Sequence, residues 1–197
     1  MNTEKLLRQS LNKASESNKD IIVRNLIDII KDINDIPESD AIISKFIEQL
    51  FAKCINEPNF IKLYVDIIYD LFMYIKPIYP NLATKLYKLL INHTQTEYSA
   101  DITIENRPDK VTCTLFVSEL INKGFINIKI ANMIIKSLLN TDNQYKHELG
   151  CIIVNKVSIK NKISKDHLER LKVLYEIPGT SQRILFKITD TIDIIEN

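Results

Sequence analysis

The chain has few of the residues that interrupt regular structure. Among its 197 residues are only 3 glycines and 6 prolines, too few for a turn-rich β-sandwich. No apolar run reaches the roughly 18 residues needed to cross a bilayer. The opening stretch MNTEKLLRQSLNK lacks the apolar segment of a signal peptide. We therefore expect long helices in a soluble, cytoplasmic protein.

An excess of charge of either sign is also absent. Lys and Arg total 26 and Asp and Glu total 25, a net charge of +1 that argues against a strongly basic nucleic-acid binder. The three cysteines, Cys54, Cys113 and Cys151, are odd in number, far apart and surrounded by apolar residues. We interpret them as buried thiols rather than as disulfides or metal ligands.

What the sequence does have is a succession of amphipathic patterns with helical spacing. They follow Leu6–Leu11 and then cover residues 18–34, 38–54, 59–75, 81–98, 110–124, 127–140, 144–158, 165–177 and 180–197. Ser39 is the predicted N-cap of its helix, Thr180 or Ser181 caps the last, and Gly124 is a predicted C′ residue. About ten helices with short turns make about five hairpins of roughly 40 residues, the period of HEAT repeats.

We predict an all-α fold, with about five antiparallel helical hairpins stacked as a HEAT-repeat solenoid. One domain would span residues 1–197, with the weakly patterned loop near 99–110 between its halves. A globular helical bundle is the rival arrangement. Two short stretches, ITI at 102–104 and FINIKI at 125–130, are alternatively short strands.

Residues 54–60, CINEPNF, interrupt two long helical patterns. Proline is tolerated in the first turn of a helix, and it disfavours helical geometry in the residue before it. Glu57 and Pro58 therefore predict that one helix ends and the next begins almost at once, in a tight turn. Phe60 would then open the apolar face of the next helix, which continues through Leu63, Tyr64, Ile67, Leu71 and Ile75.

The last helical segment carries an aromatic residue among charges. Its apolar stripe consists of Ile184, Ile188, Ile192 and Ile195. At about 100° per residue, Phe186 lies roughly 160° from the centre of that stripe, on the side of Arg183, Asp190 and Asp193. Exposed aromatic and arginine side chains dominate binding hot spots. The alternative is that Phe186 packs against a neighbouring helix.

No set of residues indicates catalysis or a metal site. His93, His147 and His167 lie in different helices, with no neighbour at metal-ligand spacing. Asp190 and Asp193 are three residues apart and suit a metal pair, but a solvated helix face explains them better. The sequence has no Gly-rich phosphate loop, Gly-x-Ser-x-Gly or His-Glu-x-x-His motif. We predict no enzymatic activity and no cofactor.

Several segments resemble the middle domain of eukaryotic initiation factor 4G. In EQLFAKCINEPNFIKLYVDIIYDL (48–71), a Glu-Pro-Asn-Phe turn is followed by a Tyr-bearing helix, as in that family. Similar segments follow in the family's order: LLRQSLNKASESN (6–18), LYKLLINHTQTEY (86–98), LFVSELINKGFINIKIANMIIKSLL (115–139), HELGCIIVNKV (147–157) and TSQRILFKITDTIDI (180–194). The resemblance covers nearly the whole chain, and it implies five HEAT-type hairpins.

The resemblance also implies a partner, the ATP-dependent DEAD-box RNA helicase initiation factor 4A. The chain would bind and stimulate the helicase by holding its two RecA-like lobes. Carried over by matching motifs, Arg183 and Phe186, with Asp190 beside them, would hold one lobe. The turn formed by Glu57, Pro58, Asn59 and Phe60 would help hold the other, or would be structural only.

The chain departs from the family in places. The family's long charged insertion is reduced to the short loop at 99–110, the basic pair after it is missing, and Leu185 replaces the second Arg of the closing motif. The shortened insertion and the missing basic pair argue against direct RNA binding. No Tyr-x-x-x-x-Leu motif for a cap-binding partner occurs. The alternatives are a related adaptor in mRNA decay, splicing or nuclear cap binding, or an RNA-binding helical repeat; mRNA and other initiation factors are further candidate partners.

Overall fold

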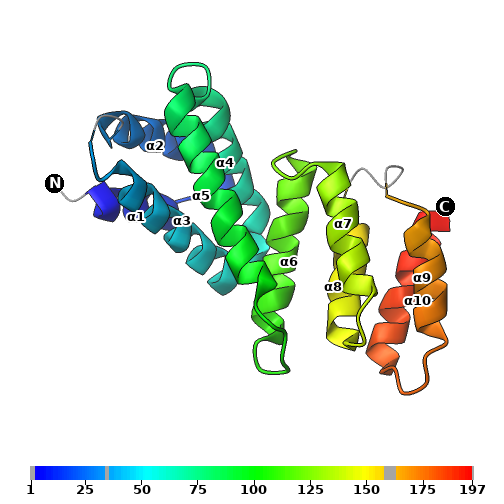
Figure 1. Ribbon diagram of the computed structural model, residues 1–197. Coiled ribbons are helices and arrows are strands. Elements are labelled where there is room, and N and C mark those ends of the chain that lie inside the picture. Colours follow the sequence, from blue (N-terminus) through cyan, green and yellow to red (C-terminus); the bar gives the residue numbers. More distant parts are fainter. Residues whose placement is uncertain (1–2, 34–35, 158–162, 197) are drawn as a thin grey trace. The chain divides into compact units, whose positions relative to one another are not determined.

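A computed structural model describes residues 3–33, 36–157 and 163–196 of the chain (Figure 1). The described residues form ten α-helices and two 3₁₀ turns, with no strand. The helices are α1 (Thr3–Asn12), α2 (Lys19–Ile33), α3 (Ser39–Asn56), α4 (Ile61–Ile75), α5 (Pro80–Ser99), α6 (Arg107–Asn122), α7 (Ile128–Leu139), α8 (Gln144–Lys156), α9 (Asp166–Tyr175) and α10 (Gln182–Glu196). The 3₁₀ turns are Glu16–Asn18 and Pro58–Phe60. Among the described helices, none is long and apolar enough to cross a membrane.

The predicted all-α class is confirmed, and the strand alternative is wrong. Residues 102–104 lie in the turn before α6, and residues 128–130 form the first turn of α7. The apolar runs there serve the core instead of a sheet: Ile102, Phe125 and Ile126 are all buried. Short apolar runs do not distinguish a strand from a loop that covers a core.

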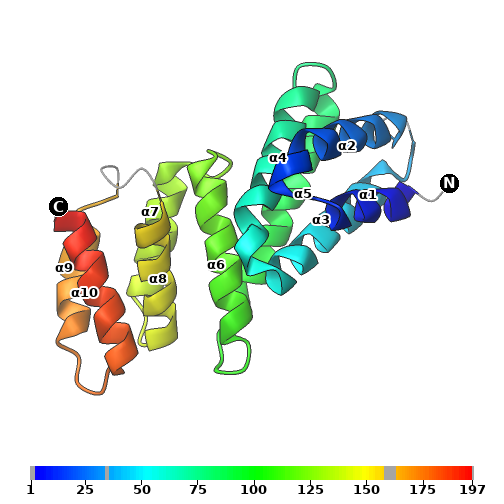
Figure 2. The same ribbon diagram turned by 180° about the vertical axis from the view of Figure 1, so that it is seen from behind.

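The chain divides into two compact units, Met1–Ser99 and Ala100–Asn197. In the first unit, α1, α3 and α5 pack in one layer, and α2 packs on α4 in the other. The second unit has α6, α8 and α10 in one layer and α7 and α9 in the other (Figure 2). Helices consecutive in sequence also pair across the layers, as α1 does with α2, α7 with α8 and α9 with α10. This is the layering of stacked helical hairpins.

Each unit has its core between its two layers. The predicted stripe of α3 is buried throughout: Ile43, Ile47, Leu50, Phe51 and Cys54. Helix α8 differs, because it packs against α6, α7 and α10 and every residue from His147 to Val154 is buried. A helix enclosed on nearly all sides has no solvated face and thus little amphipathic pattern.

Two predicted helix ends have different outcomes. Ser39 is wrong as an N-cap by one residue: Glu38 occupies that position, and Ser39 is buried with its Oγ 3.0 Å from Lys85 Nζ. Gly124 is confirmed as the C′ residue of α6, with φ +79°. Its N–H donates to the carbonyl oxygen of Ile121 (3.0 Å), while the N–H of Phe125 donates to that of Leu120 (2.9 Å). These two bonds form a Schellman motif, which requires a left-handed residue.

The loop between α5 and α6 is shorter than the predicted 99–110. Helix α5 continues to Ser99, and α6 begins at Arg107 with Pro108 in its first turn. Proline is compatible with that position, because the first N–H groups of a helix have no partner within the helix. The side chain of Asn106 organises the remaining loop, accepting from the N–H of Thr103 (2.8 Å) and donating to the carbonyl oxygen of Asp101 (2.8 Å).

Candidate functional site

Helix α10 has one buried face and one charged, aromatic face. Ile184, Ile188 and Thr191 are buried against the rest of the unit. On the opposite side, the Phe186 side chain is 68% exposed. The predicted exposure of Phe186 is therefore confirmed, and the alternative in which it packs against a neighbouring helix is wrong. Asp190, one turn further along, is also exposed.

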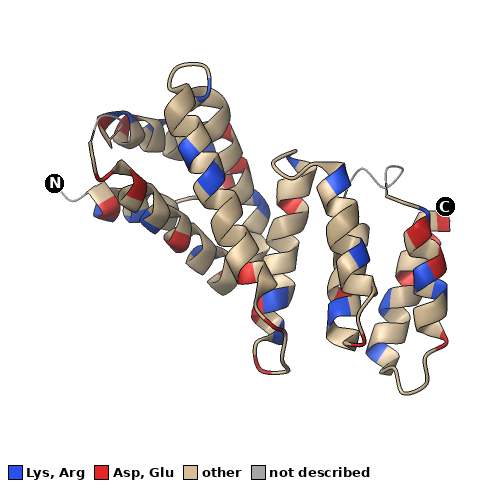
Figure 3. Cartoon of the chain, in the orientation of Figure 1, with Lys and Arg blue, Asp and Glu red and all other residues tan. Residues whose placement is uncertain are grey.

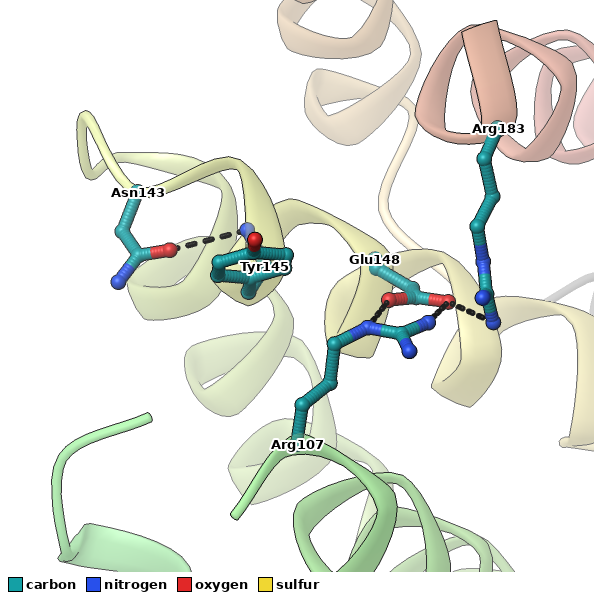
Figure 4. Close-up of polar contacts among 5 residues, drawn as sticks. All are labelled: Arg107, Asn143, Tyr145, Glu148 and Arg183. Atoms are coloured by element: carbon teal, nitrogen blue, oxygen red, sulfur yellow. Dashed lines mark hydrogen bonds and ion pairs between the residues drawn. The ribbon is translucent and has the colours of Figure 1, made fainter. Parts of the chain in front are cut away.

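Arg183, one turn before Phe186, is anchored at one end of its guanidinium. Its Nη2 lies 3.1 Å from Oε1 of Glu148 in α8, while 62% of its side chain remains exposed (Figure 4). The ion pair therefore restricts where the guanidinium lies without removing it from the surface.

Glu148 lies at the centre of this cluster and is fully buried. Arg107, the first residue of α6, binds its carboxylate in a bidentate manner: Nε donates to Oε2 (2.8 Å) and Nη2 donates to Oε1 (2.7 Å). A buried carboxylate is costly unless it is paired and hydrogen-bonded, and the planar guanidinium fork matches both of its oxygens. The ion pairs join α6, α8 and α10, the three helices of one layer.

The start of α8 holds this cluster in place. Asn143 caps the helix, its Oδ1 accepting from the N–H of Tyr145 at 2.9 Å (Figure 4). The Tyr145 ring lies next to Arg107, with the guanidinium carbon 6.0 Å from the ring centroid. Gln144 Oε1 accepts from the N–H of Ser181 (3.2 Å), which ties the start of α8 to the start of α10.

The second predicted site is the turn between α3 and α4 in the first unit. Glu57 has φ −132° and ψ 63°, and Pro58 opens the 3₁₀ turn, as the sequence predicts. The Glu57 carboxylate accepts hydrogen bonds from Lys53 Nζ (2.5 Å) and from the Tyr64 hydroxyl. These two bonds lower the pKa of Glu57 below its ordinary value, against the opposing effect of burial. Its carboxylate is thus occupied within the turn.

The other residues of the turn are accessible. Pro58 and Asn59 are exposed, and the Phe60 side chain is 45% exposed. The prediction that Phe60 opens the apolar face is therefore wrong: the buried face begins at Ile61, because the 3₁₀ turn before it directs residue 60 outward. An exposed aromatic next to a rigid proline leaves a surface suited to a protein contact.

The histidines have structural surroundings. His93 meets the ring of Phe51 edge to face, with centroids 4.5 Å apart. His147 and His167 are buried, their Nε2 atoms 2.7 Å from the Thr141 carbonyl oxygen and 3.0 Å from Asn132 Oδ1. Burial lowers the pKa of both. Within the described ranges, no three His, Cys, Asp or Glu side chains are grouped to hold a metal.

The three cysteines are buried and form no disulfide, as predicted. Burial raises the pKa of Cys151 to about 11, which keeps its sulfur in the thiol form at neutral pH.

The sequence analysis did not identify the residues within the chain that contact the two candidate sites. The weak pattern of residues 99–110 predicts a loop at Arg107, and Glu148 is 41 residues away from it in the sequence. The available signal is that Glu148 directly precedes the uncharged run Leu149–Val154, because a carboxylate buried with that run must find a counter-charge. For the turn, the i,i+4 spacing of Lys53 and Glu57 was the signal for their ion pair.

The layered helices define a class of protein: an α-helical repeat protein. The sequence matches the profile of the MIF4G domain over residues 4–194. The chain therefore belongs to the MIF4G domain family, whose members are helical protein-interaction scaffolds. No curated protein matches the sequence.

Among solved structures, the fold is similar to the crystal structure of the MIF4G domain of Trypanosoma cruzi translation initiation factor EIF4G5. The TM-score is 0.62 and the sequence identity 14%, with 100% of this chain and 96% of that chain covered. At this identity the likeness shows the fold alone. It confirms the predicted HEAT-type helical solenoid over the rival helical bundle.

Proposed function

We propose that this protein is a non-enzymatic translation initiation scaffold that binds and stimulates initiation factor 4A, the DEAD-box RNA helicase. The observation that supports the proposal most is the exposure of Phe186 beside Arg183 on α10 of a MIF4G fold. The ring supplies apolar area, and the guanidinium supplies directed charge and hydrogen bonds. Together they have the composition of a hot spot.

In this proposal each unit of the chain contacts one lobe of the helicase. The α10 surface, defined as Arg183, Phe186 and Asp190, binds one lobe. The exposed part of the α3–α4 turn, Pro58, Asn59 and Phe60, binds the other, with Glu57 shaping the turn through Lys53 and Tyr64. Holding both lobes near their closed arrangement removes part of the entropy cost of closure, so ATP turnover speeds up. The ATP site belongs to the helicase.

The distribution of charge favours a protein partner over RNA. The net charge is +1, and residues of both signs are interspersed over both units (Figure 3). Neutralising phosphates requires a concentration of Lys and Arg on one surface. The proposed site of action is the cytoplasm, where translation takes place.

The experiment is to mix the protein with initiation factor 4A and measure the RNA-stimulated ATPase. Wild-type protein is expected to raise the rate, and Phe186→Ala to remove most of the increase. The matched control is Met133→Ala in α7, since Met133 is 70% exposed in the same unit but lies on the other layer. This control is expected to stimulate like wild type.

The outcomes distinguish an error in the proposed partner from an error in the proposed contact surface. If wild type neither stimulates nor binds initiation factor 4A, the proposed client is wrong, and helicases of mRNA decay and splicing are tested next. If wild type stimulates and Phe186→Ala does so equally, only the proposed surface is wrong. A complex with RNA alone that weakens steeply with salt would instead support direct RNA binding.

A further inference from the structure

Two guanidinium groups share the buried carboxylate of Glu148, and they share it unequally. Arg107 contacts both oxygens, at 2.7 Å and 2.8 Å. Arg183 has a single contact, 3.1 Å from Nη2 to Oε1. The exposures differ in the same sense, with 17% of the Arg107 side chain accessible to solvent against 62% for Arg183. Arg107 is the main counter-charge of Glu148, and Arg183 is held only at its edge.

The cluster of Arg107, Glu148 and Arg183 has more positive charge and more hydrogen-bond donors than its one carboxylate neutralises or binds. Two guanidiniums and one carboxylate leave one positive charge in excess. A guanidinium has five N–H donors, and the contact with Glu148 uses only Nη2 of Arg183. The remaining donors belong to a mostly exposed side chain beside Phe186. The excess charge is therefore on the surface, where a carboxylate of a partner would complete the cluster.

We propose that Arg107 is a positioning residue for the partner surface: because it binds both oxygens of Glu148, Arg183 is held by one contact only and stays available to bind an aspartate or glutamate of the partner. The inference rests on the proposed function insofar as α10 must be the contact surface. Arg107 itself does not touch the partner. Its effect passes through Glu148 to Arg183.

Removal of Arg107 gives the opposite arrangement. In Arg107→Gln, the buried carboxylate of Glu148 retains only one counter-charge. The guanidinium of Arg183 is then expected to turn inward and bind both carboxylate oxygens, through two of its N–H groups. A buried carboxylate holds such a partner strongly, because the alternative is an unpaired charge in the interior. Arg183 would then no longer be available to a partner, although Arg183 itself is not substituted.

The first test uses the free protein and needs no helicase. The Nε–Hε signal of Arg183, assigned by nuclear magnetic resonance, reports how strongly its guanidinium is held. In Arg107→Gln this proton is expected to exchange with water more slowly than in wild type, because the guanidinium is more deeply bound. The milder variant Arg107→Lys keeps the charge but loses the bidentate contact, so a smaller slowing of the same proton is expected, and it is used if Arg107→Gln does not fold. Unchanged exchange in a folded variant would overturn the proposal.

The second test is a double-mutant cycle in the affinity for initiation factor 4A. Arg107→Gln is expected to weaken binding roughly fivefold or more, as for residues coupled through a shared partner. In an Arg183→Ala, Glu148→Gln background, where no buried charge is left unpaired, the same change is expected to have no further effect. A merely structural role, or direct contact of Arg107 with the partner, would instead give losses that multiply, which would overturn the proposal.

The matched control is Arg170→Gln, in α9 of the same unit. Arg170 is also half-buried and donates from Nε to the carbonyl oxygen of Leu139 (2.9 Å), but none of its described contacts involves Glu148. This variant is expected to leave both the Arg183 signal and the affinity unchanged. If Arg183→Ala alone binds like wild type, the proposed surface fails; if it weakens binding and Arg107→Gln does not, only the positioning inference fails.

Discussion

The hydroxyl of Tyr64, in the first turn of α4, donates a hydrogen bond to the carboxylate of Glu57, the C-cap residue that follows α3. Tyr64 is almost fully buried, whereas the Glu57 side chain is partly exposed. Burial, followed by this bond, raises the pKa of Tyr64 well above its usual range. The bond thus fixes the α3–α4 turn from its buried side and leaves Pro58, Asn59 and Phe60 at the surface.

Tyr64→Phe tests the importance of this bond for stability. The variant retains the ring and loses only the hydroxyl. Its unfolding free energy is expected to fall by about 1.5 kcal/mol, the low end of the range for a hydrogen bond to a charged group, because Glu57 is partly exposed. Tyr74→Phe, on the exposed end of the same helix, is the control and should change stability by less than about 0.5 kcal/mol. Urea denaturation measures both. Equal losses would show that the Tyr64 hydroxyl contributes nothing specific.

We expect the protein to lose stability below neutral pH because of His147. Its pKa is lowered below the ordinary 6.5 mainly by burial, partly offset by the bond to the carbonyl of Thr141, with Arg170 lowering it further and Asp142 raising it. The unfolded chain therefore takes up the proton first as the pH falls. The contribution of neutral His147 is complete above pH 6.5 and is lost as the pH falls toward its folded-state pKa, at a slope of at most about 1.4 kcal/mol per pH unit.

The measurement is the unfolding free energy between pH 7.5 and pH 5, for wild type and His147→Gln. The variant keeps a donor for the Thr141 carbonyl but does not titrate, so its slope should be shallower. Some slope remains, because burial also lowers the pKa of His167. Identical slopes for the two proteins would contradict the assignment.

We expect that replacing Gly150 in α8 by alanine, a better helix former, destabilises the protein. A Cβ at this position would lie 2.8 Å from Cδ2 and 3.2 Å from Cγ of Leu139, in the neighbouring helix α7. The gain in helix propensity is about 1 kcal/mol, but overpacking costs about 1–3 kcal/mol. Gly150→Ala should therefore lower the unfolding free energy by roughly 1 kcal/mol net.

A double mutant identifies the cause. In a Leu139→Ala background the clash is absent, so Gly150→Ala should become neutral or stabilising, measured by the same denaturation. If Gly150→Ala costs the same in both backgrounds, the close approach of Leu139 is not the reason for a glycine at this position.

The sequence predicts the fold well where helices have one solvated side. In α3 the stripe from Ile43 to Cys54 alternates with polar residues, so its period identifies both the helix and its buried face. Helix α8 has no such alternation, because neighbours enclose it. Its helical character could be predicted from length and context, but the burial of Glu148 could not.

The candidate site was partly predictable for the same reason. Phe186 is visible in the sequence because a helical period places it opposite Ile184 and Ile188, and its exposure follows from that. The contact of Arg183 with Glu148, 35 residues away in the sequence, depends on the packing of α10 against α8, which no local pattern encodes. The outward direction of Phe60 depends on a 3₁₀ turn, which has fewer residues per turn than an α-helix. The side chain of residue 60 is therefore rotated away from the buried face of α4, and hydrophobic periodicity does not reveal so small a rotation.

The central claim is that the α10 surface binds initiation factor 4A, and calorimetric titration of the helicase with three proteins tests it most directly. Wild type and Met133→Ala are expected to bind with equal affinity. Phe186→Ala should bind about thirtyfold more weakly, the loss of about 2 kcal/mol expected at a hot spot. Absence of binding by folded wild type, or equal affinities for Phe186→Ala and Met133→Ala, would contradict the account.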